Sequence, residues 1–240
     1  MNNPNKKLSV VLPCYNEELN IPRLVPELWP VLESLNIDFE VVLVDDGSKD
    51  KTIEEINKIQ KPQLRLVKHE VNKGIGMAMR TGINAVNADQ VIFLDSDLTF
   101  HPKYIPDLLK ASNLHPEADF IIGSPGLGGY DGDIQGWRLA ISKIANLIYK
   151  VILGKPITSV NQIFRLYKAE QLKQLKLSSV GFDINAEILF KMVFGKRKFV
   201  EIPTELTVRI YGESKLNYTR EIGRHMVLIL KILKWKFFGI

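Results

Sequence analysis

Two aspartates, Asp95 and Asp97, follow the apolar run Val91-Ile92-Phe93-Leu94 and carry the clearest chemical signal in the sequence. An apolar run of this length between polar residues is typical of a buried strand in a parallel sheet. Open α/β sheets bind ligands at the carboxyl ends of such strands, and two carboxylates placed there need a cation or hydrogen-bond donors as partners. Because hard oxygen ligands suit Mg²⁺ or Mn²⁺ in contact with substrate phosphates, the pair predicts a metal site. A chance D-x-D is the alternative.

A second acidic pair, Asp45-Asp46, is followed by Gly47-Ser48 and closes another predicted strand. Adjacent carboxylates at this position can accept hydrogen bonds from ribose hydroxyls or from base N–H groups. The alternative is turn and cap chemistry, because D-G-S is itself a turn signal. We expect Ser48 or Asp50 to cap the next helix, which leaves Asp45 and Asp46 free for a ligand.

Residues suited to a nucleoside follow the first predicted strand, in Pro13-Cys14-Tyr15-Asn16-Glu17. A dinucleotide-binding fold has G-x-G-x-x-G at this turn, and the lack of that motif here argues against a dehydrogenase. Tyr15 is placed to stack or pack beside a nucleoside, and Glu17 to bond it or to cap the helix. Capping by Asn16 is the alternative, and it is compatible with these roles.

A short glycine pattern, Asn72-Lys73-Gly74-Ile75-Gly76, follows the third predicted strand. Two glycines before a helix allow the backbone to approach a phosphate closely. A lone G-x-G is weak as a signal, so this segment supports a phosphate site only in combination with the others.

The elements that must position these residues alternate regularly through the first half of the chain. Apolar runs predict strands at Leu8–Pro13, Phe39–Asp46, Leu64–Glu70, Gln90–Asp97 and Ala118–Ser124. Helical periodicity predicts helices at Glu17–Leu35, Asp50–Lys61, Gly76–Val86 and Pro102–Leu114. This βαβα alternation predicts an α/β fold with a mainly parallel central sheet flanked by helices.

The second half of the chain lacks this regular alternation. It begins with the glycine-rich segment Gly126–Gly136, which we interpret as a loop that orders over substrate. The predicted elements after it are a helix at Trp137–Leu153, a strand at Val160–Tyr167, a helix at Ile184–Phe194, an extended stretch at Phe199–Ile210 and a helix at Asn217–Phe238. We expect one domain over residues 1–216, followed by a C-terminal amphipathic helix over residues 217–240.

The C-terminal stretch Met226–Ile240 is rich in Leu, Ile, Trp and Phe and is interrupted by Lys231, Lys234 and Lys236. No apolar run in the sequence reaches the ~18 residues that span a bilayer. Two interpretations stay open: a helix lying in a membrane interface, or a helix packed on the sheet with its lysines in water.

The amino-acid composition is typical of a soluble globular protein without disulfides. The chain is 45% hydrophobic and 25% charged, which is ordinary for a soluble globular protein. Its single cysteine, Cys14, excludes an internal disulfide framework and fits a reducing cytoplasm. No apolar stretch of signal-peptide length precedes the first predicted strand.

The charge is distributed unevenly along the chain: residues 1–120 carry a net charge of −5 and residues 121–240 one of +10. The basic half suits phosphates or an anionic membrane surface, and nucleic acid is not expected because no nucleic-acid motif accompanies the charge.

In their order and positions, these segments resemble the successive signatures of inverting glycosyltransferases of family 2, which have the GT-A fold. The matching segments are Leu12-Pro13-Cys14-Tyr15-Asn16-Glu17, Val44-Asp45-Asp46-Gly47-Ser48, Asn72-Lys73-Gly74 and Asp95-Ser96-Asp97. A later segment, Arg209-Ile210-Tyr211-Gly212-Glu213-Ser214-Lys215-Leu216, is similar to the R-x-x-G-x-S-K-L segment of dolichyl-phosphate mannose synthases and related polyprenyl-phosphate glycosyltransferases. The resemblance covers most of the chain, and the combination is specific although no single motif is.

The resemblance implies a role for each matching residue. The substrate-binding residues would be Pro13, Tyr15, Glu17, Asp45, Asp46, Lys73, Gly74, Ser96 and Arg138. Among them, Asp46, with Asp45, would read base or ribose. Asp95 and Asp97 would hold Mg²⁺ or Mn²⁺ on the diphosphate, Asp97 most directly. The catalytic residues would be Asp97, Arg209 and Lys215, and Arg138, Arg209 and Lys215 would meet phosphate charge. For Arg209 and Lys215 the alternative is an ordinary surface cation.

Three positions depart from the pattern that these families share. Gly123-Ser124-Pro125 stands where relatives commonly read Gly-Ser-Arg, and Ile163-Phe164-Arg165 stands where Gly-Phe-Arg is usual. Thr99 occupies the position of a metal-binding Gln in some mannose synthases. These departures leave the sugar donor and the acceptor open, whereas the reaction class is retained.

The resemblance implies a metal-dependent inverting glycosyltransferase that moves a hexose from GDP-mannose or UDP-glucose to a polyprenyl or dolichyl phosphate. A phosphate acceptor is already ionised at neutral pH, so no general base is required. Such an enzyme would be cytoplasmic and peripheral at the cytoplasmic face of a membrane. One alternative is a family-2 transferase acting on a saccharide or protein hydroxyl, with Asp183 or Glu187 as the base. Another is a non-catalytic nucleotide-sugar-binding member, which Pro125 and Ile163 motivate.

Overall fold

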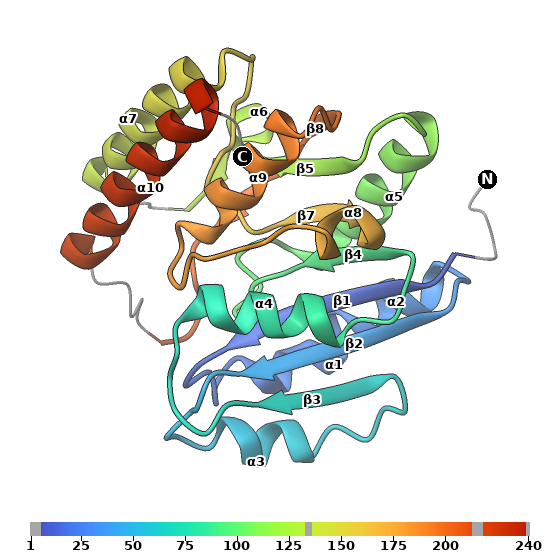
Figure 1. Ribbon diagram of the computed structural model, residues 1–240. Coiled ribbons are helices and arrows are strands. Elements are labelled where there is room, and N and C mark those ends of the chain that lie inside the picture. Colours follow the sequence, from blue (N-terminus) through green and yellow to red (C-terminus); the bar gives the residue numbers. More distant parts are fainter. Residues whose placement is uncertain (1–5, 133–135, 213–217, 239–240) are drawn as a thin grey trace.

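The computed structural model describes residues 6–132, 136–212 and 218–238, without the side chains of 137–142 and 218. Within these residues a seven-stranded sheet has the order β3-β2-β1-β4-β7-β5-β8 (Figure 1). Its strands are β1 (Leu8–Cys14), β2 (Phe39–Asp45), β3 (Leu64–Lys68), β4 (Gln90–Phe93), β5 (Phe120–Ser124), β7 (Arg165–Lys168) and β8 (Phe199–Pro203). Only β7 runs antiparallel to its neighbours, so the predicted mainly parallel sheet is confirmed.

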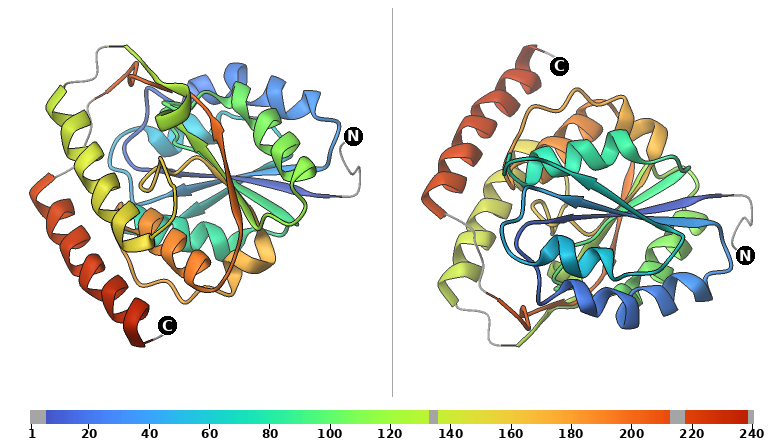
Figure 2. Two further views of the ribbon diagram at one scale, coloured as in Figure 1. Left: turned by 90° about the horizontal axis from the view of Figure 1, so that it is seen from above. Right: turned by 90° about the horizontal axis from the view of Figure 1, so that it is seen from below.

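Helices cover both faces of the sheet, as Figure 2 shows in its two edge-on views. One face carries α1 (Ile21–Glu27), α2 (Trp29–Ser34), α3 (Thr52–Asn57) and α5 (Ile105–Leu114), and the other carries α4 (Ile75–Ala85), α8 (Ala169–Lys173) and α9 (Ile184–Phe194). Successive strand residues point to opposite faces. Val10 and Leu12 of β1 therefore pack in the core of the first face and Val11 in that of the second.

Several predicted boundaries differ from the observed ones for local reasons. The single helix expected over Glu17–Leu35 is two helices, since Pro30 lacks the N–H that would continue the helical hydrogen bonds. The strand expected to reach Asp97 ends at Phe93. Of the strand expected at Val160–Tyr167 only the end is β7, because Val160 bonds to the Asn146 and Arg165 side chains instead of a neighbouring strand.

The second half adds smaller elements around the sheet. They are η1 (Pro102–Tyr104), α6 (Pro125–Gly128), β6 (Tyr130–Asp131), α7 (Gly136–Leu153), β9 (Leu206–Thr207) and α10 (Tyr218–Phe238). The predicted glycine-rich loop thus contains α6 and β6, and β6 pairs with β9. Helices α7 and α10 lie side by side beyond one end of the sheet (Figures 1 and 2), where the Tyr149 hydroxyl lies 2.6 Å from His225 Nδ1.

Helix α10 is buried on one side and exposed on the other. Leu228 and Ile232 belong to the core next to α9, whereas Met226, Leu230 and Phe237 are exposed. Among the described residues, no helix combines the length and apolar character that crossing a membrane requires.

Candidate active site

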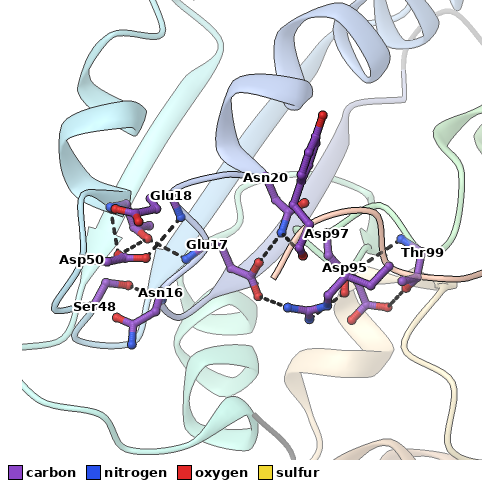
Figure 3. A network of polar contacts seen from close by, with 12 residues as sticks. Asn16, Glu17, Glu18, Asn20, Ser48, Asp50, Asp95, Asp97 and Thr99 are labelled. Carbon is purple, nitrogen blue, oxygen red and sulfur yellow. Dashed lines mark hydrogen bonds and ion pairs between the residues drawn. The ribbon is translucent and has the colours of Figure 1, made fainter. Parts of the chain in front are cut away.

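Four side chains predicted to take part in chemistry come together at the carboxyl ends of β1 and β4. Arg209 lies between Glu17 and Asp97, with one guanidinium nitrogen 3.1 Å from Glu17 Oε1 and the other 2.7 Å from Asp97 Oδ2. Figure 3 shows Glu17 facing the turn that carries Asp95 and Asp97. Because β1 and β4 are adjacent and parallel, their carboxyl ends meet at one edge of the sheet.

Among the described side chains, the carboxyl groups of Glu17, Asp95 and Asp97 outnumber the one guanidinium, that of Arg209, which pairs with carboxylates of this cluster. Burial, followed by repulsion from Asp97, raises the pKa of Asp95 well above its usual range. Burial opposes the charge of Arg209, but Asp97 and Glu17 outweigh this effect, so the pKa of Arg209 is raised. A carboxyl group that resists ionisation beside another carboxylate indicates that a further cation would stabilise the site.

The donor set at this turn fits a divalent cation of the Mg²⁺ type. Asp95 and Asp97 offer carboxylate oxygens, and Thr99 Oγ1 lies 3.5 Å from Asp95 Oδ2. Across the described part of the chain there is no group of three or more His, Cys, Asp or Glu arranged to hold a metal. Mg²⁺ characteristically takes one or two carboxylates and completes its shell with waters and substrate phosphates, so a two-aspartate site suits it.

The second acidic pair is satisfied mainly by the backbone. Asp46 accepts hydrogen bonds from the backbone N–H groups of Lys73 and Gly74, at 2.9 and 2.7 Å, and from the His69 ring at 2.6 Å. Asp45 Oδ2 accepts from the N–H groups of Gly47 and Ser48. The expectation that both carboxylates are left free is therefore wrong for Asp46, which braces the Lys73-Gly74 turn.

One oxygen of this pair differs from the others. Asp45 Oδ1 is buried and has no hydrogen-bond partner among the described residues. Buried acceptors are almost always paired in folded proteins. Contact of this oxygen with a nucleoside stays a prediction.

The glycines after β3 make room for protein backbone. Gly74 has φ +93°, and a Cβ on it would lie 2.4 Å from the Val180 carbonyl oxygen. A Cβ on Gly76 would lie 2.6 Å from the Val180 carbonyl carbon, and the Gly76 N–H donates to Val180 O. The close approach that these glycines permit is thus to the loop before α9. Phosphate binding by this turn stays a prediction.

The loops after β1 and β2 are joined by side-chain to backbone contacts, which makes the site continuous (Figure 3). The Asn16 N–H donates to Ser48 Oγ and the Lys49 N–H to Asn16 Oδ1. Asn16 therefore does not cap α1, contrary to the alternative considered above. Asp50 accepts from the N–H of Thr52, the first residue of α3, but the N-cap position itself is Lys51, whose side chain makes no capping bond.

Of the remaining predicted residues, some lie near the cluster and two cannot be placed because they fall outside the described residues. Pro13 is buried in β1, Tyr15 is half-buried just after it, and Ser96 is buried between the two aspartates. Neighbouring Cys14 is no nucleophile, since burial raises the pKa of its thiol and Sγ donates to Val44 O. Lys215 and the Arg138 side chain lie outside the described residues.

Two residues of the site were not found by sequence reasoning. Asn20 Nδ2 donates to Glu17 Oε2 at 2.7 Å, and Arg23 donates to the backbone carbonyl of Asp97 at 2.9 Å. The only available signal was the spacing of Arg23 and Glu27, which pair across one turn of α1. That spacing does not show that Arg23 reaches a turn 74 residues away.

The acids considered as an alternative general base are engaged in local structure. Glu187 accepts from the N–H groups of Ser178 and Ser179 and pairs with Lys191. Burial by itself raises the pKa of Glu187, but these partners outweigh burial, and the net pKa is lowered. Asp183 accepts from the Gly181 N–H. Both carboxylates thus hold the loop before α9.

The departures from the family pattern also have structural explanations. Arg165 is fully buried and donates to the backbone carbonyls of Asn185 and Ser159, so it braces the core. Ile163 is part of the core of the second face, and Pro125 begins α6. These residues are consistent with a folded, intact domain.

Comparisons with known proteins agree with this geometry. Residues 9–176 match the model of glycosyl transferase family 2. The chain is 31% identical over 236 residues to a dolichol-phosphate mannosyltransferase of Pyrococcus furiosus, covering 96% of this chain and 64% of the relative. It is 30% identical over 224 residues to an undecaprenyl-phosphate 4-deoxy-4-formamido-L-arabinose transferase of Photorhabdus laumondii, covering 91% of this chain and 65% of the relative. The chain therefore spans somewhat less than two thirds of the length of these curated relatives.

Solved structures show the same fold. A glucosyl-3-phosphoglycerate synthase from Mycobacterium tuberculosis, crystallised with Mn²⁺, UDP and glucosyl-3-phosphoglycerate, superimposes with a TM-score of 0.71 at 21% identity, covering 96% of this chain and 79% of that one. The predicted GT-A architecture is confirmed by this likeness. With the family model matching well over half of the sequence, the chain belongs to glycosyl transferase family 2.

Proposed function

We propose that this protein is a metal-dependent, inverting glycosyltransferase that moves a hexose from a nucleoside-diphosphate sugar to a polyprenyl phosphate. The observation that carries the proposal is the cluster of Asp95, Asp97 and Arg209 at the carboxyl ends of β1 and β4. Membership of the family supports the reaction class. The names of the two curated relatives, which refer to dolichol phosphate and undecaprenyl phosphate, support the acceptor class.

The donor would bind along the edge formed by the loops after β1, β2 and β4. Asp95 and Asp97 would hold Mg²⁺ or Mn²⁺, and this ion would supply Lewis-acid stabilisation of the leaving diphosphate. Asp45 Oδ1, buried and unpaired among the described residues, is suited to accept from the nucleoside. Pro13, Tyr15, Glu17 and Ser96 would line the pocket, and Lys73, Gly74 and Arg138 would lie toward the phosphates. Asp46 would act by holding the Lys73-Gly74 turn.

The acceptor would need compensation of its charge more than removal of a proton. A phosphate is already ionised at neutral pH, so a general base is unnecessary. Arg209, which here pairs with Glu17 and Asp97, would contact the phosphate together with Lys215. A hydroxyl acceptor would require a base, and Asp183 and Glu187 are engaged in holding their own loop. This contrast favours the phosphate acceptor.

We place the protein at a membrane surface, where such a lipid acceptor resides. Exposed apolar residues lie on α7 (Ile144, Leu147, Val151) and on α10 (Met226, Leu230, Phe237). Lysines accompany them on the exposed parts of both helices, among them Lys150, Lys231 and Lys234. Apolar and basic side chains together are typical of helices that lie in an anionic interface. The division into a catalytic domain, 1–216, and an interfacial helix, 217–240, belongs to this proposal, as does attachment at the cytoplasmic face.

A donor panel tests the enzymatic proposal. GDP-mannose, UDP-glucose and related donors are incubated with polyprenyl phosphate in vesicles, with Mg²⁺, with Mn²⁺ and with excess EDTA. We expect one donor to give a product that partitions into organic solvent, is labile to mild acid and forms only with a divalent cation. Full activity in EDTA would contradict the metal role. A water-soluble glycoside would indicate a hydroxyl acceptor, and donor binding without turnover would indicate a non-catalytic member.

Vesicle flotation tests the membrane contact. Leu230 on α10 and Leu114 at the end of α5 are both 67% exposed, and the two helices lie at opposite ends of the molecule (Figure 1). We expect Leu230→Asp to lower binding to anionic vesicles, because it places a carboxylate in the apolar surface. Leu114→Asp is the matched control and should bind as the unaltered protein does. Equal binding by all three proteins would remove α10 from the interface.

A further inference from the structure

The turn that carries the two aspartates is held by a residue of another element. We propose that Arg23 of α1 is a positioning residue for the metal site, acting on the backbone of the Asp95–Thr99 turn. This inference rests on the proposed function, because it concerns the cation that Asp95 and Asp97 would hold.

The backbone of this turn has an uncommon conformation. Leu98 has φ +57°, in the left-handed region, although its side chain is only 3% exposed and packs in the core. Residues with a Cβ are disfavoured in this region, and leucine lacks the polar side chain that helps Asn or Asp to adopt it. Such a conformation persists only where the surroundings fix it. The contacts around Leu98 therefore help to set the orientation of the Asp95 and Asp97 side chains.

Arg23 supplies the contact on the N-terminal side of Leu98. Its guanidinium donates at 2.9 Å to the carbonyl of Asp97, which belongs to the peptide bond that joins Asp97 to Leu98. Two other nitrogens of the same guanidinium bond both oxygens of Glu27, at 2.8 and 3.1 Å. The Arg23 side chain is 13% exposed. Because Glu27 holds the guanidinium in one orientation, the Arg23 side chain loses little conformational freedom when its third nitrogen donates to the turn.

The C-terminal side of Leu98 has its own contacts. Thr207 of β9 donates to the Thr99 carbonyl from its N–H at 2.9 Å and from its hydroxyl at 3.0 Å. Within the turn, the Leu98 N–H donates to Asp95 O and the Thr99 N–H to Asp97 Oδ1. The backbone of the turn is thus held by two separate elements, and of these two Arg23 is the one that contacts Asp97 itself.

Arg23 and Arg209 act on different atoms of Asp97. Arg209 contacts the carboxylate oxygen Oδ2, which a metal would also use, whereas Arg23 contacts the main-chain carbonyl. A metal at the carboxylates would therefore compete with Arg209 and would leave the Arg23 contact in place. Outer residues that orient metal ligands typically contribute about 10- to 100-fold to metal affinity. We assign Arg23 a role of this kind.

Direct titration of Mn²⁺ tests the assignment. Mn²⁺ binding to the full chain is followed by electron paramagnetic resonance, alone and in the presence of UDP or GDP. We expect Arg23→Met to weaken Mn²⁺ binding by about 10- to 100-fold, because the turn loses its donor to Asp97. Arg23→Lys keeps one donor without the fork and should give an intermediate affinity. Nucleotide affinity in EDTA should be unchanged in both variants.

Arg65→Met is the matched control. Arg65 likewise pairs with a carboxylate, Glu40, and donates to a backbone carbonyl, that of Ala85, but it lies on β3 away from the aspartates. It should bind Mn²⁺ as the unaltered protein does. A drop in Mn²⁺ affinity equal to that of Arg23→Met would show a general loss of structure and would overturn the proposal.

The remaining outcomes are also decisive. If Arg23→Met binds Mn²⁺ as tightly as the unaltered protein, Arg23 is only a structural residue. If Arg23→Met does not fold, Glu27→Gln keeps the guanidinium and weakens its orientation; unchanged Mn²⁺ affinity there overturns the proposal, and a reduced one supports it. If the unaltered protein binds no Mn²⁺ with or without nucleotide, the metal site itself fails and the role of Arg23 fails with it. That result is distinguishable because it appears before any substitution.

Discussion

Two aspartate pairs lie at the ends of β2 and β4, on either side of β1, and their surroundings are opposite. Asp46 is bonded by two backbone N–H groups and a histidine, and Asp45 by two further N–H groups through one of its oxygens. Asp97 instead meets the guanidinium of Arg209, and the pKa of Asp95 is raised by burial and by Asp97. The first pair is hydrogen-bonded by the backbone, whereas the negative charge of the second pair is not fully compensated by the described residues and would favour a cation.

This difference teaches that the position of an acid at a strand end does not decide its role. Backbone donors fix a carboxylate permanently, since they cannot leave without unfolding the turn that carries them. A side-chain cation such as Arg209 can be exchanged for another cation. The second pair is therefore the one suited to chemistry, and the first pair contributes a rigid turn and one unpaired oxygen, Asp45 Oδ1.

The largest expected effect comes from Asp97→Asn. This substitution removes one of two carboxylates that would hold the metal, and we expect a loss of transferase activity of about 10³-fold or more, or roughly 4 kcal/mol in transition-state free energy. Mn²⁺ binding should fall with it, while the circular dichroism spectrum stays unchanged. The measurement is turnover with the preferred donor beside an Mn²⁺ titration. Retained activity would contradict the assignment of the second aspartate pair, and not the first, to the metal.

Asp46→Asn should act on stability. The variant weakens three hydrogen bonds to a buried carboxylate and places an amide donor against N–H groups, so we expect the free energy of unfolding to fall by about 2–4 kcal/mol. Urea denaturation followed by tryptophan fluorescence measures it. Mn²⁺ affinity of the folded fraction should be unaffected. An Asp46→Asn protein with normal stability but no nucleotide binding would show that Asp46 is a ligand residue instead.

Asp45→Asn tests whether the unpaired oxygen, Asp45 Oδ1, accepts a hydrogen bond from the nucleotide. The amide oxygen can keep the bonds from Gly47 and Ser48, which places an NH₂ group where Asp45 Oδ1 now lies. A donor there opposes a ligand N–H or O–H, so we expect nucleotide affinity to drop about tenfold, or roughly 1.4 kcal/mol, with a smaller change in stability. Isothermal titration with UDP and GDP measures this. Unchanged affinity for both nucleotides would leave Asp45 as a turn residue only.

The smallest expected effect is on pH dependence. Because its pKa is raised in the folded protein, Asp95 keeps its proton to higher pH when folded than when unfolded. The metal-free protein should therefore lose stability as pH rises from the ordinary aspartate pKa, about 3.9, through the raised pKa of Asp95. Mn²⁺ affinity should change in the opposite direction, falling as pH drops through the same range. Denaturation in EDTA across this range measures the first trend, and Asp95→Asn should flatten both.

Much of the fold was predictable because its first half follows simple periodicities. The five N-terminal strands and most helices lie where apolar runs and helical spacing placed them, and α9 was predicted at its observed bounds. The insertion of β7 antiparallel between β4 and β5 was not predictable, since a strand's own residues do not specify its neighbours. Nor was the short α8, whose few residues carry no clear period.

The amino-acid sequence determined which acids stand at strand ends, because apolar runs fix the strands and the residues after them share one sheet edge. It did not determine what each acid meets there. The donors to Asp46 come from a turn 27 and 28 residues away, and Arg209 and Arg23 reach the second pair from still more distant segments. Only the tertiary structure brings these groups within hydrogen-bond distance. The charge state and exchangeability of a carboxylate depend on such partners and on burial, which neighbours along the chain do not set.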